Sequence, residues 1–215
     1  MRGVPNNFAT GSNDNSTSHG NTYQADQAET ELTTLRTAVI VGSLRRESIN
    51  KKLAEAIVGL SPPTFDFFSI TLADLPMYNQ DLEPDRPESV RRFTSECASS
   101  DAILFVMPEF NRSIPAVLKN AIDWGSKPMD RNVWRDKPVA ITGASPGAIG
   151  TAVGQQHLRQ VMGILGSSVM GGEAYISFKP DLIGTDGRIQ DQNVEAFLNA
   201  YMKRFAVFAM KLMAA

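Results

Sequence analysis

The sequence predicts an α/β fold in which helices cover both faces of a parallel β-sheet. Short apolar runs, typical of buried parallel strands, alternate with longer segments whose apolar residues recur at helical spacing. Strands that alternate with helices imply right-handed crossovers, which make the strands parallel. Hydrophobic residues form 42% of the 215-residue chain, which is ordinary for a protein that buries one core.

The pattern divides the chain into a polar tail, residues 1–34, and one folded domain, residues 35–215. Asn, Ser, Thr, Gly and Gln dominate the tail, and apolar residues have no period there. Such a segment buries too little surface to repay the entropy of ordering. We therefore expect a flexible tail.

The first half of the domain contains three predicted strands and the helices between them. The apolar run 37–42 ends in a glycine, and the helix that follows places Leu53, Ile57 and Leu60 on one face. Pro115 stands at the start of the third helix, where proline is tolerated. In this half we expect strands at 37–42, 65–70 and 101–107, and helices at 48–60, 88–99 and 114–124.

The second half continues the alternation and closes with a long amphipathic helix. We expect strands at 137–142 and 168–176 and a helix at 149–163. From Val194 to Leu212 apolar residues follow helical spacing, and Lys203, Arg204 and Lys211 interrupt that segment. This indicates a helix that docks on the domain. Five strand–helix units fit a flavodoxin-like doubly wound sheet of order 2-1-3-4-5, with ligands outside the carboxyl ends of the strands.

Charge and composition argue against several classes of protein. Lys plus Arg is 21 and Asp plus Glu is 23, so a net charge of −2 gives no basis for binding nucleic acid or an anionic membrane. Cys97 is the only cysteine and there are two histidines, too few for a structural zinc cluster. Neither a membrane span nor a signal-peptide pattern is present. We expect no metal and a cytoplasmic location.

Three loops at the carboxyl ends of the strands carry candidate site residues. The first reads Gly42-Ser43-Leu44-Arg45-Arg46-Glu47-Ser48-Ile49-Asn50 and opens a helix, whose N-terminus attracts anions. Its hydroxyl, amide and guanidinium groups suit one phosphate monoester. The loop lacks both the Walker lysine and the G-x-G-x-x-G pattern, so ATP and dinucleotides fit poorly. The alternative is that Ser48 only caps the helix and that Arg45 and Arg46 are solvated.

The second and third loops suit a flat heterocycle. The second is Pro108-Glu109-Phe110-Asn111-Arg112-Ser113-Ile114-Pro115, which prolines stiffen; the alternative is a plain connector. The third runs from Gly143 to Gly150 and contains G-x-S-x-G, the nucleophile elbow of α/β-hydrolases. Pro146 follows Ser145 and has no N–H for an oxyanion hole, and the only later histidine is His157. We therefore reject the hydrolase and expect the small residues to admit a ligand.

These loops, with two further segments, resemble the NADPH-dependent FMN reductase family, above all its chromate and quinone reductase members. The resemblance covers about residues 37–176. The residues that carry it are Gly42-Ser43-x-Arg45-x-x-Ser48-x-Asn50, Leu75-Pro76-Met77-Tyr78-Asn79-Gln80-Asp81-Leu82-Glu83, Pro108-Glu109-Phe110-Asn111 and Lys119-Asn120-Ala121-Ile122-Asp123-Trp124. Many relatives carry Tyr where this chain has Phe110, so any role of that hydroxyl is missing here.

The resemblance implies an FMN-dependent NAD(P)H oxidoreductase with ping-pong transfer of two electrons to quinones, chromate or similar small molecules. It implies a homodimer or homotetramer, and no catalytic side chain is nominated. The implied FMN contacts are Ser43, Arg45, Ser48, Ile49 and Asn50 for the phosphate and Pro108, Glu109, Phe110, Asn111, Ser113, Ser145, Pro146 and Gly147 for the ring. NADPH or NADH is the implied co-substrate.

Several residues and two other functions remain as hypotheses. Arg112 is a possible substrate contact or else a solvated or subunit-pairing arginine. By analogy Asp123, Trp124 and His157 lie on helices of a dimer seam, and residues 75–83 either cap a neighbouring flavin site or pack as an ordinary loop. A flavodoxin-like electron carrier and a flavin-based sensor, both without turnover, are the alternative functions. Such carriers tend to be strongly acidic, which the net charge of −2 argues against.

Overall fold

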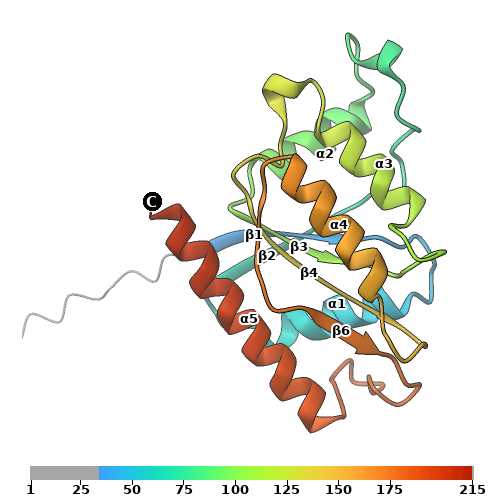
Figure 1. Ribbon diagram of the computed structural model, residues 1–215, viewed down its shortest axis with the longest axis vertical. Coiled ribbons are helices and arrows are strands. Elements are labelled where there is room, and N and C mark those ends of the chain that lie inside the picture. Colours follow the sequence, from blue (N-terminus) through green and yellow to red (C-terminus); the bar gives the residue numbers. More distant parts are fainter. Residues whose placement is uncertain (1–33, 215) are drawn as a thin grey trace, which may run out of the picture. The chain divides into compact units, whose positions relative to one another are not determined.

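The computed structural model describes residues 34–214 of the chain (Figure 1). Residues 1–33 of the predicted tail lie outside this range. The flexibility of the tail therefore stays a prediction. In the described part, no helix combines the length and apolar character needed to cross a membrane.

A parallel sheet of order β2-β1-β3-β4-β5 forms the centre of the domain and confirms the predicted topology. Its strands are β1 (Leu35–Val41), β2 (Phe65–Ile70), β3 (Ala102–Val106), β4 (Pro138–Ser145), β5 (Ser168–Val169) and β6 (Ala174–Ser177). Val39 pairs with Ser69 on one side and with Leu104 on the other, so β1 lies between β2 and β3. The strand order therefore reverses at β1, where doubly wound sheets bind their ligands.

The predicted strand 168–176 is wrong in one respect: it is broken into β5 and β6, both of which pair with β4. The chain bends at Gly171 and Gly172, and Gly172 has a φ of 77°, outside strand geometry. At this break Tyr201 takes the place of a strand partner. Its hydroxyl donates to the Ile141 carbonyl at 2.9 Å and accepts from the Ile141 N–H at 3.1 Å, and burial raises its pKa to about 12.

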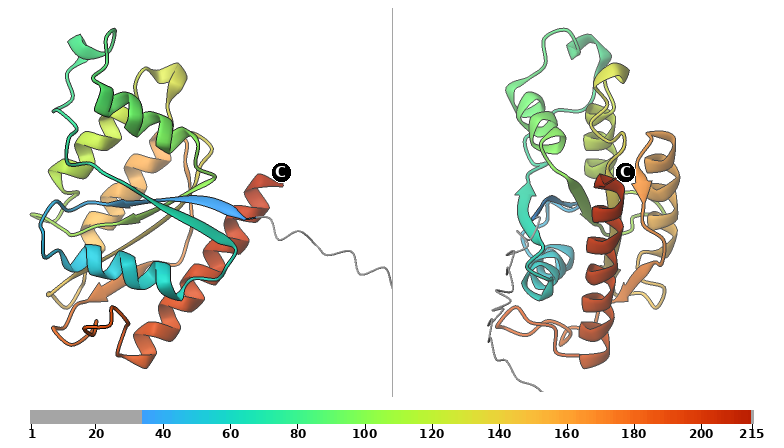
Figure 2. Two further views of the ribbon diagram at one scale, coloured as in Figure 1. Left: turned by 180° about the vertical axis from the view of Figure 1, so that it is seen from behind. Right: turned by 90° about the vertical axis from the view of Figure 1, so that its left-hand side faces the viewer.

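Two layers of helices cover the sheet (Figure 2). One apolar cluster joins the sheet to α1 (Ile49–Leu60) and α5 (Gln192–Met213). The other joins it to α2 (Glu88–Ala98), α3 (Ala116–Gly125) and α4 (Ala152–Ile164). Short 3-10 helices lie at Gln80–Leu82 and Met129–Arg131. Cys97 is fully buried in the second cluster.

Two helices begin later than the sequence predicts. Pro115 is the N-cap of α3 and not a residue of its first turn, because its ψ of 141° is not helical. Helix α4 begins at Ala152 and not at 149, since Gly150 has a φ of 59° and breaks the helical path. The later start of α3 lengthens the loop after β3. The strand predicted at 137–142 continues to Ser145, so the loop after β4 moves along the chain without becoming longer.

Candidate functional site

Three loops meet at the carboxyl edge of the sheet because β1, β3 and β4 are adjacent. The first loop (residues 42–48) follows β1, the second loop (107–115) follows β3, and the third loop (145–151) follows β4. They lie on the right-hand side of Figure 1. The structure thus brings the predicted site residues to one edge of the molecule.

The first loop exposes cationic and donor groups that no other part of the described chain uses. Arg45 and Arg46 are exposed, and their guanidinium groups make no hydrogen bond or ion pair in the described residues. Ser43 is half-buried, and its hydroxyl is similarly free there. The first turn of α1 contains no acidic residue, and the N–H groups of Ile49 and Asn50 find no acceptor in residues 34–214. This end of α1 is therefore electropositive.

Ser48 caps α1, as one of the sequence interpretations held. Its hydroxyl oxygen accepts from the Lys51 N–H at 3.3 Å, its backbone is extended, and only 4% of the residue is exposed. A cap of this kind uses an oxygen lone pair and leaves the hydroxyl hydrogen available. Ser48 can therefore cap the helix and donate to an anion at the same time.

Asn50 joins the first loop to the end of β4 across 94 positions of sequence. Its amide nitrogen donates to the Ala144 carbonyl at 2.9 Å, and its amide oxygen accepts from the Ala144 N–H at 2.8 Å. Only 1% of Asn50 is exposed. The oxygen and one hydrogen of this predicted phosphate ligand are thus already used, so its first role is to fix two loops relative to each other.

The second loop contains a tight hairpin and is not a plain connector. Phe110 and Ser113 exchange two backbone hydrogen bonds, of 3.2 and 2.9 Å. Asn111 and Arg112 between them have φ angles of 51° and 61°. Two successive left-handed residues are the geometry of a type I′ turn, which costs energy for residues other than glycine. The hairpin presents Phe110 with 58% of its surface exposed.

Glu109 holds the second loop against α4. One carboxylate oxygen accepts from the Gly154 N–H at 2.9 Å, and the other lies 3.3 Å from the Arg112 guanidinium. The Glu109 side chain is 7% exposed and that of Arg112 is 66% exposed. A carboxylate that accepts from an N–H of the first turn of a helix is favourable, because the N-terminal end of the helix is positive. Gly154 permits this approach, since a Cβ there would lie 3.0 Å from the Ser113 carbonyl oxygen.

The third loop is closed by its own hydrogen bond. The Ser145 hydroxyl donates to the Gly150 carbonyl, while Pro146 and Gly147 are exposed. His157 contacts the Ser113 hydroxyl at 3.1 Å from its Nδ1 and does not contact Ser145. Among residues 34–214, Ser145 therefore has no histidine partner of the kind a hydrolase needs, which supports rejecting that function.

The residues expected at a dimer seam are largely bonded within the chain. Trp124 is fully buried, and its indole N–H donates to the Pro76 carbonyl at 2.8 Å, so it is not an interface partner. Asn120 also bonds Pro76 and accepts from the Tyr78 N–H at 2.7 Å. Asp123 pairs with Lys119 at 2.7 Å. These bonds tie residues 75–83 to α3 of the same chain.

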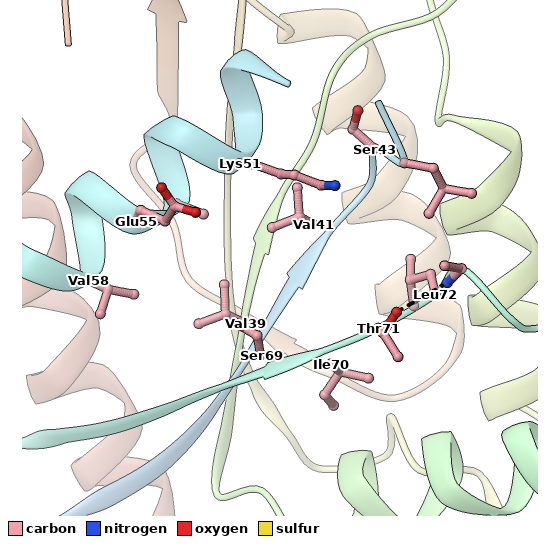
Figure 3. A pocket seen from close by; sticks show the side chains of 13 residues that line it. Val39, Val41, Ser43, Lys51, Glu55, Val58, Ser69, Ile70, Thr71 and Leu72 are labelled. Atoms are coloured by element: carbon pink, nitrogen blue, oxygen red, sulfur yellow. Dashed lines mark hydrogen bonds between the residues drawn. The ribbon is translucent and has the colours of Figure 1, made fainter. Parts of the chain in front are cut away.

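Sequence reasoning missed one feature at this edge, a cavity between α1 and β2 (Figure 3). Of the predicted site residues only Ser43 lines it. No motif marks the cavity, because its walls come from positions that look like ordinary core residues of two strands and a helix.

Comparisons with known proteins agree with these features. A family model described as NADPH-dependent FMN reductase matches residues 35–181. A 2-hydroxy-1,4-benzoquinone reductase from Burkholderia sp. is 45% identical over 175 residues, which cover 81% of this chain and 96% of that protein. A quinone reductase from Pseudomonas putida is 43% identical over 171 residues, 79% of this chain and 91% of that protein. FerB of Paracoccus denitrificans, a flavoenzyme NAD(P)H:(acceptor) oxidoreductase, superimposes with a TM-score of 0.80 at 39% identity and covers 83% of this chain and 98% of its own.

Proposed function

The chain belongs to the NADPH-dependent FMN reductase family, and from this premise we propose that it transfers two electrons from NAD(P)H through FMN to quinones. The relatives that match over most of the chain carry the names of quinone reductases and of an NAD(P)H:(acceptor) oxidoreductase. Chromate as a further acceptor and the cytoplasm as the location rest on the sequence alone and stay parts of the proposal.

The first loop carries the proposal because it fits the phosphate of FMN. Arg45 has no partner in the described residues, the first turn of α1 has no acid, and the N–H groups of Ile49 and Asn50 are free there. A phosphate monoester would satisfy these donors together with the hydroxyls of Ser43 and Ser48. No acidic side chain has to move for this, so the residues present fit the group.

The second and third loops fit the ring of FMN. The hairpin from Phe110 to Ser113 and the exposed pair Pro146 and Gly147 would border a flat ligand on two sides. The chemistry that FMN supplies when bound is two-electron transfer from NAD(P)H to the acceptor. The chain binds and orients the partners, with Arg112 as a cation at the edge of the same loop.

Turnover without a second protein tests this function. The purified chain with FMN should oxidise NADPH in the presence of benzoquinone, and with each substrate varied in turn the kinetics should be ping-pong. An electron carrier needs a separate reductase and would show no such oxidation. A sensor would bind FMN tightly and likewise leave NADPH unchanged, so the absence of turnover would overturn the proposal.

We also propose that a second copy of the chain packs on the face formed by α3 and α4. A groove of about 630 Å³ lies there, lined by Ser113, Ile114, Lys119, His157, Gln160, Val161 and Ile164. Ile164 is 84% exposed, a high value for an isoleucine. The groove borders the second loop, which fits the homodimer or homotetramer that the family resemblance implies.

Light scattering on size-separated protein tests this interface. Ile164→Asp should shift the mass toward the monomer, because it replaces an exposed apolar side chain that lines the groove with a charge. Val207→Asp on α5, where Val207 is 49% exposed, is the matched control and should leave the mass unchanged. If wild-type protein is monomeric, or if both variants behave alike, the α3–α4 interface is wrong.

A further inference from the structure

The cavity between α1 and β2 overlaps the proposed FMN contacts at Ser43 alone. It has a volume of about 410 Å³ and lies between α1 and the C-terminal halves of β1 and β2 (Figure 3). It shares Ser43 and Leu44 with the first loop, whereas Arg45, Ser48 and the second and third loops lie outside its lining. FMN bound at those loops would therefore leave most of the cavity open.

The walls of this cavity are apolar. Val39 and Val41 of β1 form one side, and Ala54 and Val58 of α1 form the other. Leu44 at the rim is 51% exposed and Val58 is 36% exposed. A cavity of this size with apolar sides is within the range of small-molecule sites, at its small end, and suits one aromatic ring.

Four polar side chains line the cavity without any partner for their functional groups in the described residues. These are Ser43, Lys51, Glu55 and Ser69. Figure 3 shows Lys51 and Glu55 extending from successive turns of α1 toward β1. They do not pair with each other, although residues at i and i+4 on a helix are neighbours. An ammonium and a carboxylate thus remain available on one wall.

We propose that this cavity binds a small hydroxylated aromatic acid. The ring occupies the apolar space between α1 and β1, Lys51 pairs with the acid group, and Glu55 accepts from the ring hydroxyl. Lys51 is half-buried and Glu55 is exposed, so a ligand with only one of these groups forgoes one charge-assisted hydrogen bond. Because Ser43 is the only proposed FMN contact in the cavity lining, the ligand binds together with FMN and does not displace it.

Isothermal titration of the FMN-loaded protein with 4-hydroxybenzoate tests the proposal. We expect binding by the wild type, and weaker binding of benzoate and of phenol, each of which lacks one of the two groups. Lys51→Ala should weaken the binding of 4-hydroxybenzoate about tenfold, the size expected for one charge-assisted hydrogen bond. Lys52→Ala is the matched control: its side chain is 52% exposed and pairs with Glu47, so the change should stay below about twofold.

A second variant tests the cavity without removing a charge. Val58→Trp should fill the space and abolish binding while FMN still binds, and circular dichroism confirms that the variant is folded. The proposal fails if the probe does not bind at millimolar concentration, if Lys51→Ala and Lys52→Ala behave alike, or if the probe competes with FMN. Since the readout is heat and not turnover, loss of probe binding leaves the proposed oxidoreductase function untouched.

Discussion

The first and second loops lie at the same edge of the sheet but use their polar side chains in opposite ways. In the first loop the Arg45 guanidinium and the Ser43 hydroxyl have no partner in the described residues. In the second loop Glu109 and Arg112 bond each other, and Ser113 bonds His157. The comparison indicates that the first loop keeps a charged group available for a ligand. In the second loop the polar side chains bond within the chain and fix the conformation of the loop. Variants of the second loop and its supports should therefore affect stability, and variants of the first loop should affect binding.

The largest effect is expected at Gly143, which lies beneath the second loop. A Cβ at this position would stand 1.9 Å from the Met107 carbonyl oxygen and 2.7 Å from the Thr151 hydroxyl, so β4 and the start of the second loop would have to separate. Gly143→Ala should lower the free energy of unfolding by about 3 kcal/mol or more in urea denaturation. Gly163→Ala in α4 is the control, because nothing lies within 4 Å of its Cβ position and helical alanine is favoured by up to about 1 kcal/mol. Equal stability of the two variants would contradict the close packing of β4 and the start of the second loop.

The next largest effect is expected at Asn50. Its side-chain amide, like the polar side chains of the second loop, is bonded within the chain. Asn50→Ala removes two hydrogen bonds and leaves the buried N–H and carbonyl of Ala144 unpaired, which should cost about 2–3 kcal/mol of unfolding free energy. Asn199→Ala is the control, since Asn199 makes one bond of 3.2 Å to Leu60 and should cost less than about 1 kcal/mol. If Asn50→Ala instead weakens FMN binding with unchanged stability, Asn50 is a ligand and not a brace.

The smallest effect on stability is expected at Glu109. Two variants there separate the contribution of its ion pair from that of its hydrogen bond. Glu109→Gln keeps an oxygen for the Gly154 N–H and loses only the ion pair with the exposed Arg112, so stability should fall by about 0.5 kcal/mol or less. Glu109→Ala removes the acceptor as well and should cost about 1–2 kcal/mol. Chemical denaturation of both variants separates the two contributions. Equal losses for Gln and Ala would show that the charge, and not the hydrogen bond, holds the loop.

The sequence predicted the sheet well because its central strands β1, β3 and β4 are short apolar runs with nearly unbroken burial. The break between β5 and β6 was missed, although Gly171 and Gly172 mark it, because the apolar residues around them satisfy a continuous strand pattern equally well. The later start of α4 had a similar local signal in Gly150. Periodicity therefore located the elements, and glycine geometry decided where they stop.

The site was predicted as a set of residues but not as a set of roles. Motif spacing placed Ser43, Arg45, Ser48 and Asn50 at one edge, yet the pairing of Asn50 with Ala144 links positions 94 apart and has no sequence signal. The hairpin at Asn111 and Arg112 lacks the glycine that usually marks a type I′ turn. The cavity beside α1 arises from packing of strands and helix, which no local pattern encodes.

The binding of FMN to two neighbouring arginine variants tests the central claim most directly, that the free guanidinium of the first loop holds a phosphate. Arg45→Ala should raise the FMN dissociation constant about tenfold in fluorescence titration, corresponding to about 1.4 kcal/mol, while the denaturation midpoint stays unchanged. Arg46→Ala, which removes the same charge one position away, should change it less than about twofold. Equal effects of the two variants, or undiminished binding by Arg45→Ala, would contradict the account.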